Sequence, residues 1–213
     1  MTIKGLGTPT DTALLISECQ NGMTNPKYST NNLLSGQVAK RGTIQNIDSL
    51  AADLREVGVP VFHVTFQGLS GFRGWAASSP LTGSIRKRPL VEGHISVEIN
   101  PGIEVVKDDI IVARHCGLTA FHGTELEYLL RNMGVRSLIV TGVSLNVALP
   151  GSVIEAVNRG FSVVVPEGCV AGATDETHDF VLGHILPVLS TVTTSEAILA
   201  ELSPESAIGA SNS

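Results

Sequence analysis

Charged and aromatic residues are scarce in this sequence of 213 residues, at 16% and 4% of the chain. The 14 Lys and Arg residues are outnumbered by 20 Asp and Glu residues, which gives a net charge of −6. The longest basic cluster is Arg86-Lys87-Arg88, which we interpret as the solvated edge of a loop. Because no longer basic run exists, we expect neither nucleic acid nor an anionic membrane surface as a partner.

Long apolar runs are also missing. No stretch approaches the roughly 18 apolar residues that span a bilayer, and residues 1–11 lack the apolar core of a signal peptide. The three cysteines, Cys19, Cys116 and Cys169, are an odd number without the spacing of a metal site. This pattern favours a protein of the reducing cytoplasm over one built on a disulfide framework.

The residues that are present alternate between short β-branched runs and segments of helical periodicity. Strands are predicted at 12–17, 59–66, 109–113, 137–141, 161–165 and 191–193. Helices are predicted at 44–57, 124–133, 146–158, 175–189 and 195–201, with Pro187 ending the fourth early. Near-continuous apolar strands indicate a sheet that is covered on both faces, and the alternation indicates parallel strands. We therefore predict one three-layer α/β/α domain over residues 1–202, with a mainly parallel sheet of about six strands and a flexible tail over 203–213.

The segment 68–101 differs from the rest because it is rich in Gly, Ser and Pro and has no clear period. It follows the second predicted strand, so it should lie at the carboxyl edge of the sheet. Ligands bind at this edge in open α/β sheets, and long loops in compact domains are often functional. We expect Trp75 of this segment to line a pocket or to contact a neighbouring subunit, and we favour the subunit.

Three strand ends should bring chemically useful side chains to that edge. Glu18 follows the first strand, Arg114 and His115 follow the third, and the sequence from Ser144 to Ala148 follows the fourth. A carboxylate, a cationic or titratable group and the start of a helix would then face one cavity. This combination suits acid–base chemistry and the stabilisation of a developing oxyanion.

The residues 13–23 (ALLISECQNGM) and 119–172 (from TAFHGTELEYLL to PEGCVAG) resemble the isochorismatase-like hydrolases. The resemblance runs from about residue 12 to residue 194 and depends on the combined order and spacing of its motifs. It implies the isochorismatase-like α/β fold, a small-molecule substrate, a homo-oligomer and no cofactor. It also implies a cis peptide at Val143-Ser144 and places the substrate-binding residues at Gln20, Phe121, Ser144 and Asn146, together with Trp75.

The amidohydrolases of this family use an Asp, Lys and Cys triad, and this chain departs from it at all three positions. Glu18 stands at the Asp position, and His115, or else Arg114, stands at the Lys position. Ala148 stands at the position of the nucleophilic cysteine, and alanine forms no thioester. For Asn146, capping of the following helix is the alternative to a role in substrate binding.

Some isochorismatases of the family also lack the cysteine and hydrolyse a vinyl ether with a carboxylic acid. Glu18 follows an apolar strand, and burial favours the protonated form that this chemistry needs. We therefore predict a cysteine-independent hydrolase with Glu18 as general acid–base and with His115 or Arg114 assisting. The alternatives are a non-catalytic ligand-binding protein and an amidohydrolase with a relocated cysteine.

The remaining histidines point to structural roles. His63 lies within a predicted strand, where a packed side chain is commoner than a ligand. His122, His178 and His184 lack the spacing of the family's metal-binding members, so we predict no metal site.

Overall fold

The computed structural model describes residues 2–203, and the expected tail at 203–213 lies outside them except for Ser203. Seven strands form one sheet. They are β1 (Thr12–Ser17), β2 (Val61–Phe66), β3 (Ile110–Arg114), β4 (Ser137–Val143), β5 (Ser162–Pro166), β6 (Val170–Ala171) and β7 (Thr191–Thr193). The order is β3-β2-β1-β4-β5-β7, with β6 beside the end of β4, and all of these pairs are parallel. The predicted parallel sheet is confirmed, and the seventh strand is the two-residue β6.

The central strand β1 shows why the sheet is covered on both faces. Leu14 and Ile16 belong to one apolar cluster, and Ala13 and Leu15 belong to the other. All four side chains are buried. Since successive side chains of a strand point to opposite faces, a strand with apolar side chains on both faces needs a helical layer on each side.

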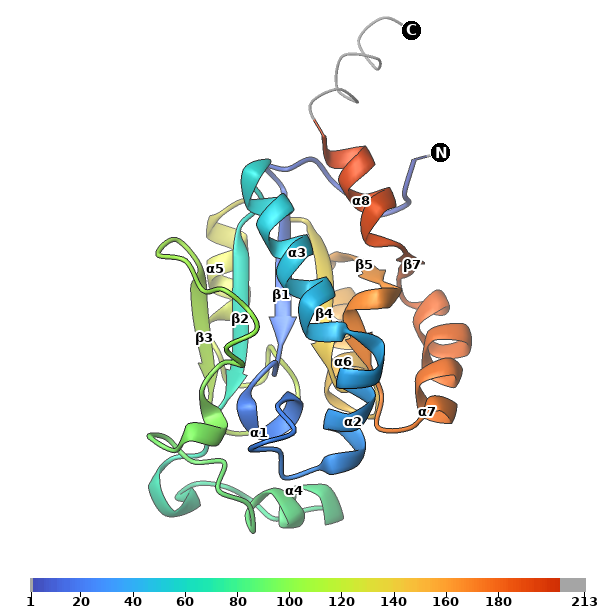
Figure 1. The fold of residues 1–213 in the computed structure, drawn as a ribbon. Coiled ribbons are helices and arrows are strands. Elements are labelled where there is room, and N and C mark those ends of the chain that lie inside the picture. The colour runs from blue at the N-terminus through green and yellow to red at the C-terminus, as the bar shows by residue number, and fades with distance from the viewer. Residues whose placement is uncertain (1, 204–213) are drawn as a thin grey trace, which may run out of the picture.

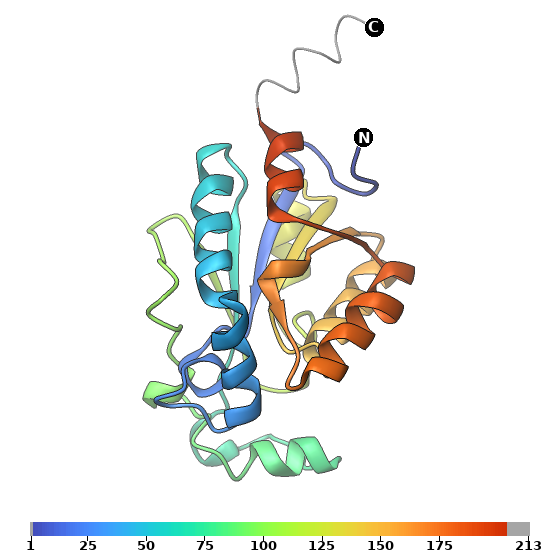
Figure 2. The same cartoon turned by 45° about the vertical axis from the view of Figure 1, so that its right-hand side comes forward.

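The two helical layers follow this division (Figures 1 and 2). One layer contains α2 (Asn32–Arg41), α3 (Thr43–Glu56) and α8 (Ser195–Leu202). The other contains α5 (Leu126–Asn132), α6 (Ala148–Asn158) and α7 (Asp175–Phe180). Beyond α7, a π-helical turn at Val181–Ile185 and a 3-10 turn at Leu186–Val188 continue the predicted helix through Pro187. Between residues 2 and 203, no helix has the length and apolar character to cross a bilayer.

The segment 68–101 contains more regular structure than the sequence indicated. It includes α4 (Pro80–Ile85) and 3-10 turns at Ser70–Phe72 and Ile95–Val97. Ser79 and Thr82 form a capping box at the start of α4, and Pro80 occupies its first position, where a missing N–H costs nothing. Figure 1 shows α4 lying across the end of the molecule toward which the strands run, near α1 (Asn21–Thr24) and α2.

Candidate functional site

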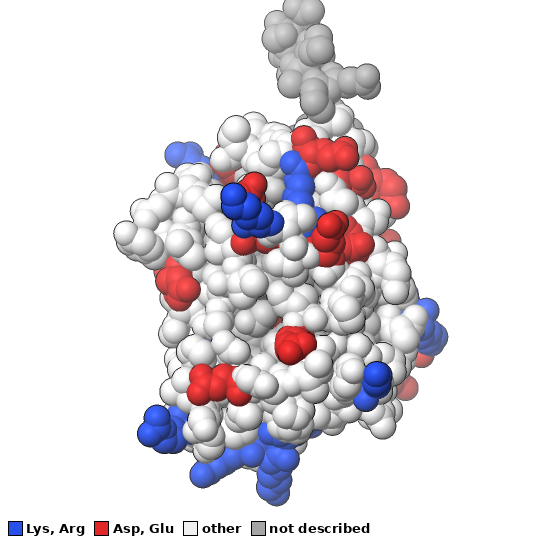
Figure 3. All heavy atoms as spheres, turned by 60° about the vertical axis from the view of Figure 1, so that its left-hand side comes forward, with Lys and Arg blue, Asp and Glu red and all other residues white. Residues whose placement is uncertain are grey.

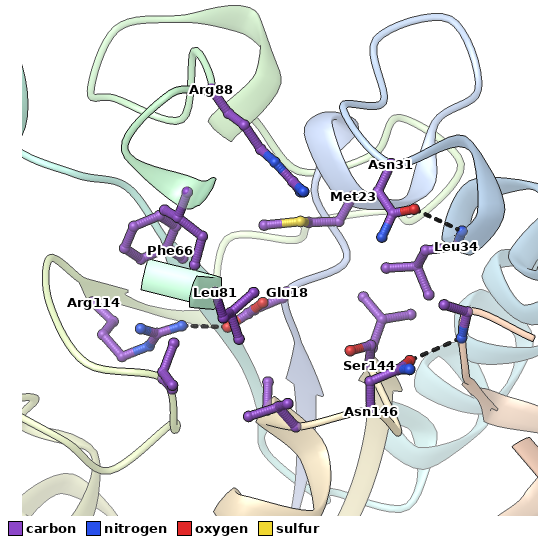
Figure 4. A pocket seen from close by; sticks show the side chains of 16 residues that line it. Glu18, Met23, Asn31, Leu34, Phe66, Leu81, Arg88, Arg114, Ser144 and Asn146 are labelled. Atoms are coloured by element: carbon purple, nitrogen blue, oxygen red, sulfur yellow. Dashed lines mark hydrogen bonds and ion pairs between the residues drawn. The ribbon is translucent and has the colours of Figure 1, made fainter. Parts of the chain in front are cut away.

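A cavity of about 260 Å³ lies at the carboxyl ends of β1, β3 and β4 (Figure 4). This volume is slightly below the roughly 300–1,000 Å³ that is usual for small-molecule sites. Ten of its sixteen lining residues are apolar or alanine. The polar lining residues are Glu18, Asn31, Arg88, Arg114, Ser144 and Asn146. A small, largely apolar molecule fits such a space better than a polymer does.

Glu18 occupies an unusual backbone conformation directly after β1. Its φ is 51°, in the left-handed region that residues other than glycine rarely adopt. Its N–H donates to the Val64 carbonyl at 2.9 Å, and its carbonyl accepts from the Gln20 N–H at 2.8 Å. These bonds hold a conformation that carries strain, and such strain concentrates at functional sites. The turn directs the carboxyl group into the cavity, where the side chain is 13% exposed.

Arg114 is the partner of Glu18. Its Nη2 forms an ion pair with Oε1 of Glu18, and its Nη1 donates to the carbonyls of Cys116, at 3.1 Å, and Gly117. The guanidinium also lies over the Phe66 ring, 4.9 Å from its centroid. A guanidinium that is bonded at both ends and stacked on an aromatic face has little freedom to move. Arg114 therefore fixes the orientation of the Glu18 carboxyl group.

Two opposing effects act on the pKa of Glu18. Burial raises the pKa because it disfavours the carboxylate, while the charge and hydrogen bond of Arg114 lower it. Burial is the larger effect, so the pKa lies above its ordinary value of 4.5. A carboxyl group of this kind holds its proton at a higher pH than a solvated one does.

The turn between β4 and α6 forms the opposite wall. Gly142 has a φ of 102°, and a Cβ there would collide with the Ser17 carbonyl oxygen of β1. The following peptide, Val143-Ser144, is cis, as the resemblance implied. The helix α6 begins at Ala148, which lines the cavity, but the N–H groups of Leu149 and Gly151 in its first turn already donate to the carbonyls of Ser144 and Val147.

Comparison with known proteins now identifies the family. The model of the isochorismatase domain matches residues 12–197. This chain belongs to the isochorismatase family.

Relatives in the family match over most of their length. The chain is 29% identical over 192 residues to the isochorismatase family protein YecD of Escherichia coli O157:H7, covering 90% of this chain and 96% of YecD. It is 24% identical to the ureidoacrylate amidohydrolase RutB of Pseudomonas savastanoi pv. phaseolicola, covering 92% and 85%. A crystal structure of a cysteine hydrolase from Pseudomonas syringae pv. phaseolicola has a TM-score of 0.79 at 19% identity, covering 94% and 96%. This structural likeness establishes the isochorismatase-like fold.

The structure separates the two residues, Arg114 and His115, that the sequence offered as partners of Glu18. Arg114 is buried and lines the cavity, whereas His115 is exposed and does not. The His115 ring lies 2.9 Å, through Nδ1, from the Gln67 carbonyl oxygen. The group next to Glu18 is therefore the guanidinium.

Gln20 and Asn146 have structural bonds that the sequence did not reveal. The amide of Gln20 is buried, donates to the carbonyls of Phe66 and Val97, and accepts from the Phe66 N–H, so it joins β1 to β2 and to the 95–97 turn. Gln20 does not line the cavity. Asn146 does, but its Oδ1 accepts from the Ala173 N–H at 2.9 Å instead of capping α6.

The two aromatic candidates also lie outside the cavity. Phe121 is buried in the core and stacks on Phe161 with ring centroids 6.0 Å apart. Trp75 packs against Phe66 and Phe72, and its Nε1 donates to the Thr82 carbonyl at 2.9 Å. Because Trp75 is only 7% exposed, it is covered by its own chain and leaves little surface for a neighbouring subunit.

None of the three cysteines lines the cavity around Glu18. Cys19 and Cys169 are buried, and burial raises both thiol pKa values, that of Cys169 to about 11. Cys116 is half-buried and lines an adjoining cavity of about 570 Å³ that also contains His122. Leu118 borders both cavities.

The sequence did not reveal one side of the cavity. One part of this side comes from α1 and α2: Met23 lies in α1, Asn31 directly precedes α2, and Leu34 lies in α2. The other part comes from Leu81 and Ile85 of α4 and from Arg88 in the loop after α4. The sequence contains helix-start patterns that could have indicated these helices: Asn31 caps α2 by accepting from the Leu34 N–H, and Ser79 precedes Pro80 at the start of α4. The expectation that Arg88 belongs to a solvated loop edge was wrong for this residue, since it is half-buried and lines the cavity.

Proposed function

We infer that the chain is a hydrolase of a small molecule that works without a cysteine nucleophile, with Glu18 as its general acid. The observation that carries this inference is a carboxyl group of raised pKa in a cavity that no cysteine lines. At the position where a thiol would stand, the first residue of α6 is Ala148. An alanine leaves acid–base chemistry as the route that these lining residues support.

The reaction that best suits a single carboxyl group of raised pKa is the hydrolysis of a vinyl ether. Glu18 transfers its proton to the terminal alkene carbon, and the π electrons form the new C–H bond. The resulting oxocarbenium ion takes up water, which loses a proton to the Glu18 carboxylate. The hemiketal then breaks its C–O bond to give an alcohol and a carbonyl compound, so that one water is consumed and the acid is regenerated.

Each neighbour of Glu18 has a role in this proposal. Arg114 holds the carboxyl group in place and stabilises the carboxylate that forms when the proton leaves. At the start of α6, Ala148 offers its N–H to an oxygen of the substrate, since the N–H groups of Leu149 and Gly151 already have acceptors. Separately from this site, we still predict that the protein is cytoplasmic and that it forms a homo-oligomer.

A panel of small vinyl ethers, amides and esters tests this proposal. We expect turnover of a vinyl ether by the wild-type chain, a loss of about 10²–10⁴-fold in Glu18→Gln, which cannot donate the proton, and full activity in Cys116→Ser. Product formation is followed by mass spectrometry, and circular dichroism verifies that both variants fold.

Two outcomes would contradict the proposal. Loss of amide hydrolysis in Cys116→Ser, with activity retained in Glu18→Gln, would establish a relocated cysteine, as the relationship to an amidohydrolase permits. Thermal stabilisation by members of the panel without any turnover would establish a binding protein.

A further inference from the structure

Arg88 carries a positive charge at the cavity that no acidic side chain balances. Its Nη1 lies 3.5 Å from the Thr30 hydroxyl and its Nη2 donates to the Ser84 hydroxyl at 3.2 Å, and both partners are neutral. Within residues 2–203, no carboxylate oxygen pairs with Arg88, whereas Arg114 in the same cavity is paired with Glu18. A half-buried guanidinium with neutral partners retains its capacity for an anion.

Asn31 offers a second donor at the same side of the cavity. Its Oδ1 accepts from the Leu34 N–H at 3.3 Å, which fixes the amide group at the start of α2. In the described part of the chain, its Nδ2 group donates to no acceptor. Figure 4 shows the Arg88 guanidinium and the Asn31 amide reaching toward the Met23 side chain from different elements. The two groups together provide a charged and a neutral donor.

The cavity thus has two polar regions with an apolar wall between them. Glu18 and Arg114 form one region, and Arg88 and Asn31 form the other, while Leu34, Leu81 and other apolar side chains line the space that remains. We propose that Arg88 and Asn31 bind the carboxylate of the substrate, so that the cavity takes small monocarboxylates whose reactive group lies apart from the carboxylate on a short apolar body. The placement of the reactive group at Glu18 rests on the proposed function, but the binding of the carboxylate does not.

The distribution of charge over the surface supports an anionic ligand. The molecule carries a net charge of −6, yet basic side chains gather at the end where α4 lies (Figure 3). Arg86 and Lys87 are exposed there beside Arg88. A local basic surface on an acidic protein attracts anions to that surface. A monoanion is the better match, because Arg88 is the one cation of the described cavity lining that lacks an acidic partner.

Benzoate and benzamide test the proposal because they share a shape and differ in charge. Their dissociation constants are measured by isothermal titration calorimetry at low ionic strength for the wild-type chain, Arg88→Gln, Arg88→Lys and Arg86→Gln. We expect the wild type to prefer benzoate by about tenfold or more, since bonds to a charged group are the stronger ones. Arg88→Gln should lose this preference, and Arg88→Lys should keep part of it. The matched control Arg86→Gln, which removes the same charge outside the cavity, should keep it.

Two results would overturn the proposal. Equal affinity of the wild-type chain for the two ligands would do so, and this comparison depends on no variant. An unchanged benzoate preference in Arg88→Gln would also do so. Vinyl ether turnover by the wild-type chain separates this proposal from the proposed function: an Arg88-dependent benzoate preference in a wild-type chain that turns over no vinyl ether supports carboxylate recognition and contradicts the hydrolase.

Discussion

At the scale of single residues, Arg114 has two effects that act in opposite directions on Glu18. Its ion pair positions the carboxyl group, but its charge also stabilises the carboxylate and so lowers the pKa. The burial of Glu18 outweighs that charge. A general acid needs both a fixed position and a raised pKa, because an acid that points in the right direction but has lost its proton cannot act.

Replacing Arg114 should separate these two effects. The rate of a general acid falls as the pH rises through its pKa, so kcat/KM should decline on the alkaline side of the Glu18 pKa. Removal of the neighbouring cation raises this pKa further, and the decline in Arg114→Gln should move up by about 1–3 pH units. Arg114→Lys, which keeps a charge, should show a smaller displacement. A pH–rate profile in which all three proteins decline at the same pH would contradict the assignment of the acid.

The sequence predicted that Glu18 belongs to the site, because a carboxylate directly after an apolar strand lies at the carboxyl edge of the sheet. It did not distinguish Arg114 from His115, since the choice depends on which face the last residue of β3 presents. The structure pairs Arg114 with Phe66 in the register of β2 and β3, and the guanidinium stacks on that ring. Register and stacking of this kind arise from the assembled sheet and not from a local pattern.

At the scale of elements, Asp109 joins three segments at the amino ends of the strands. Its carboxylate accepts from Arg55 Nε at 3.0 Å and Nη2 at 2.8 Å, in the bidentate geometry typical of strong pairs. Oδ2 also lies 3.0 Å from His63 Nε2 and accepts from the Val106 N–H. The last turn of α3, the strand β2 and the loop before β3 therefore meet at one side chain that is 2% exposed.

Asp109→Asn should destabilise the fold by about 3 kcal/mol, because it leaves Arg55 without its charged partner. Urea unfolding measures the change. Asp53→Asn is the matched control, since the exposed Asp53 forms no ion pair within residues 2–203 and its replacement should change stability by less than about 0.5 kcal/mol. Burial by itself raises the Asp109 pKa, but the hydrogen bonds from Arg55, His63 and the Val106 N–H, together with the charge of Arg55, outweigh burial and lower that pKa. The stabilisation by Asp109 should therefore be fully present at a pH above its ordinary pKa of 3.8. It should be lost as the pH falls through the lowered pKa of the folded protein. Equal stability of the two variants would contradict this role.

The elements that the sequence did not predict share a physical reason. The helix α2 contains Ser35 and Gly36 and buries only Leu34, Ser35 and Val38, so its apolar periodicity is weak. The helix α4 has six residues, fewer than a periodic pattern needs. Both depend on capping and on contacts with the rest of the molecule, and both contribute to the cavity.

At the scale of the whole molecule, the sheet could be predicted and the cavity only in part. Largely apolar strands that alternate with helices leave few arrangements other than a parallel sheet between two layers. The cavity combines these strand ends with side chains from α1, α2, α4 and the loop after α4. The sequence did not show which of these segments would fold over the edge, so Arg88 and Asn31 were missed while Gln20, Phe121 and Trp75 were expected to bind the substrate.

Hydrolysis of a vinyl ether in D₂O tests most directly whether Glu18 protonates a carbon atom. If it does, the released carbonyl product carries one deuterium on the former alkene carbon, and this label is absent from product that is dissolved in D₂O afterwards. We expect one deuterium for each turnover of the wild-type enzyme, as read by mass spectrometry, and loss of this product in Glu18→Gln. Carbonyl product formed at the wild-type rate without deuterium on that carbon would contradict the mechanism.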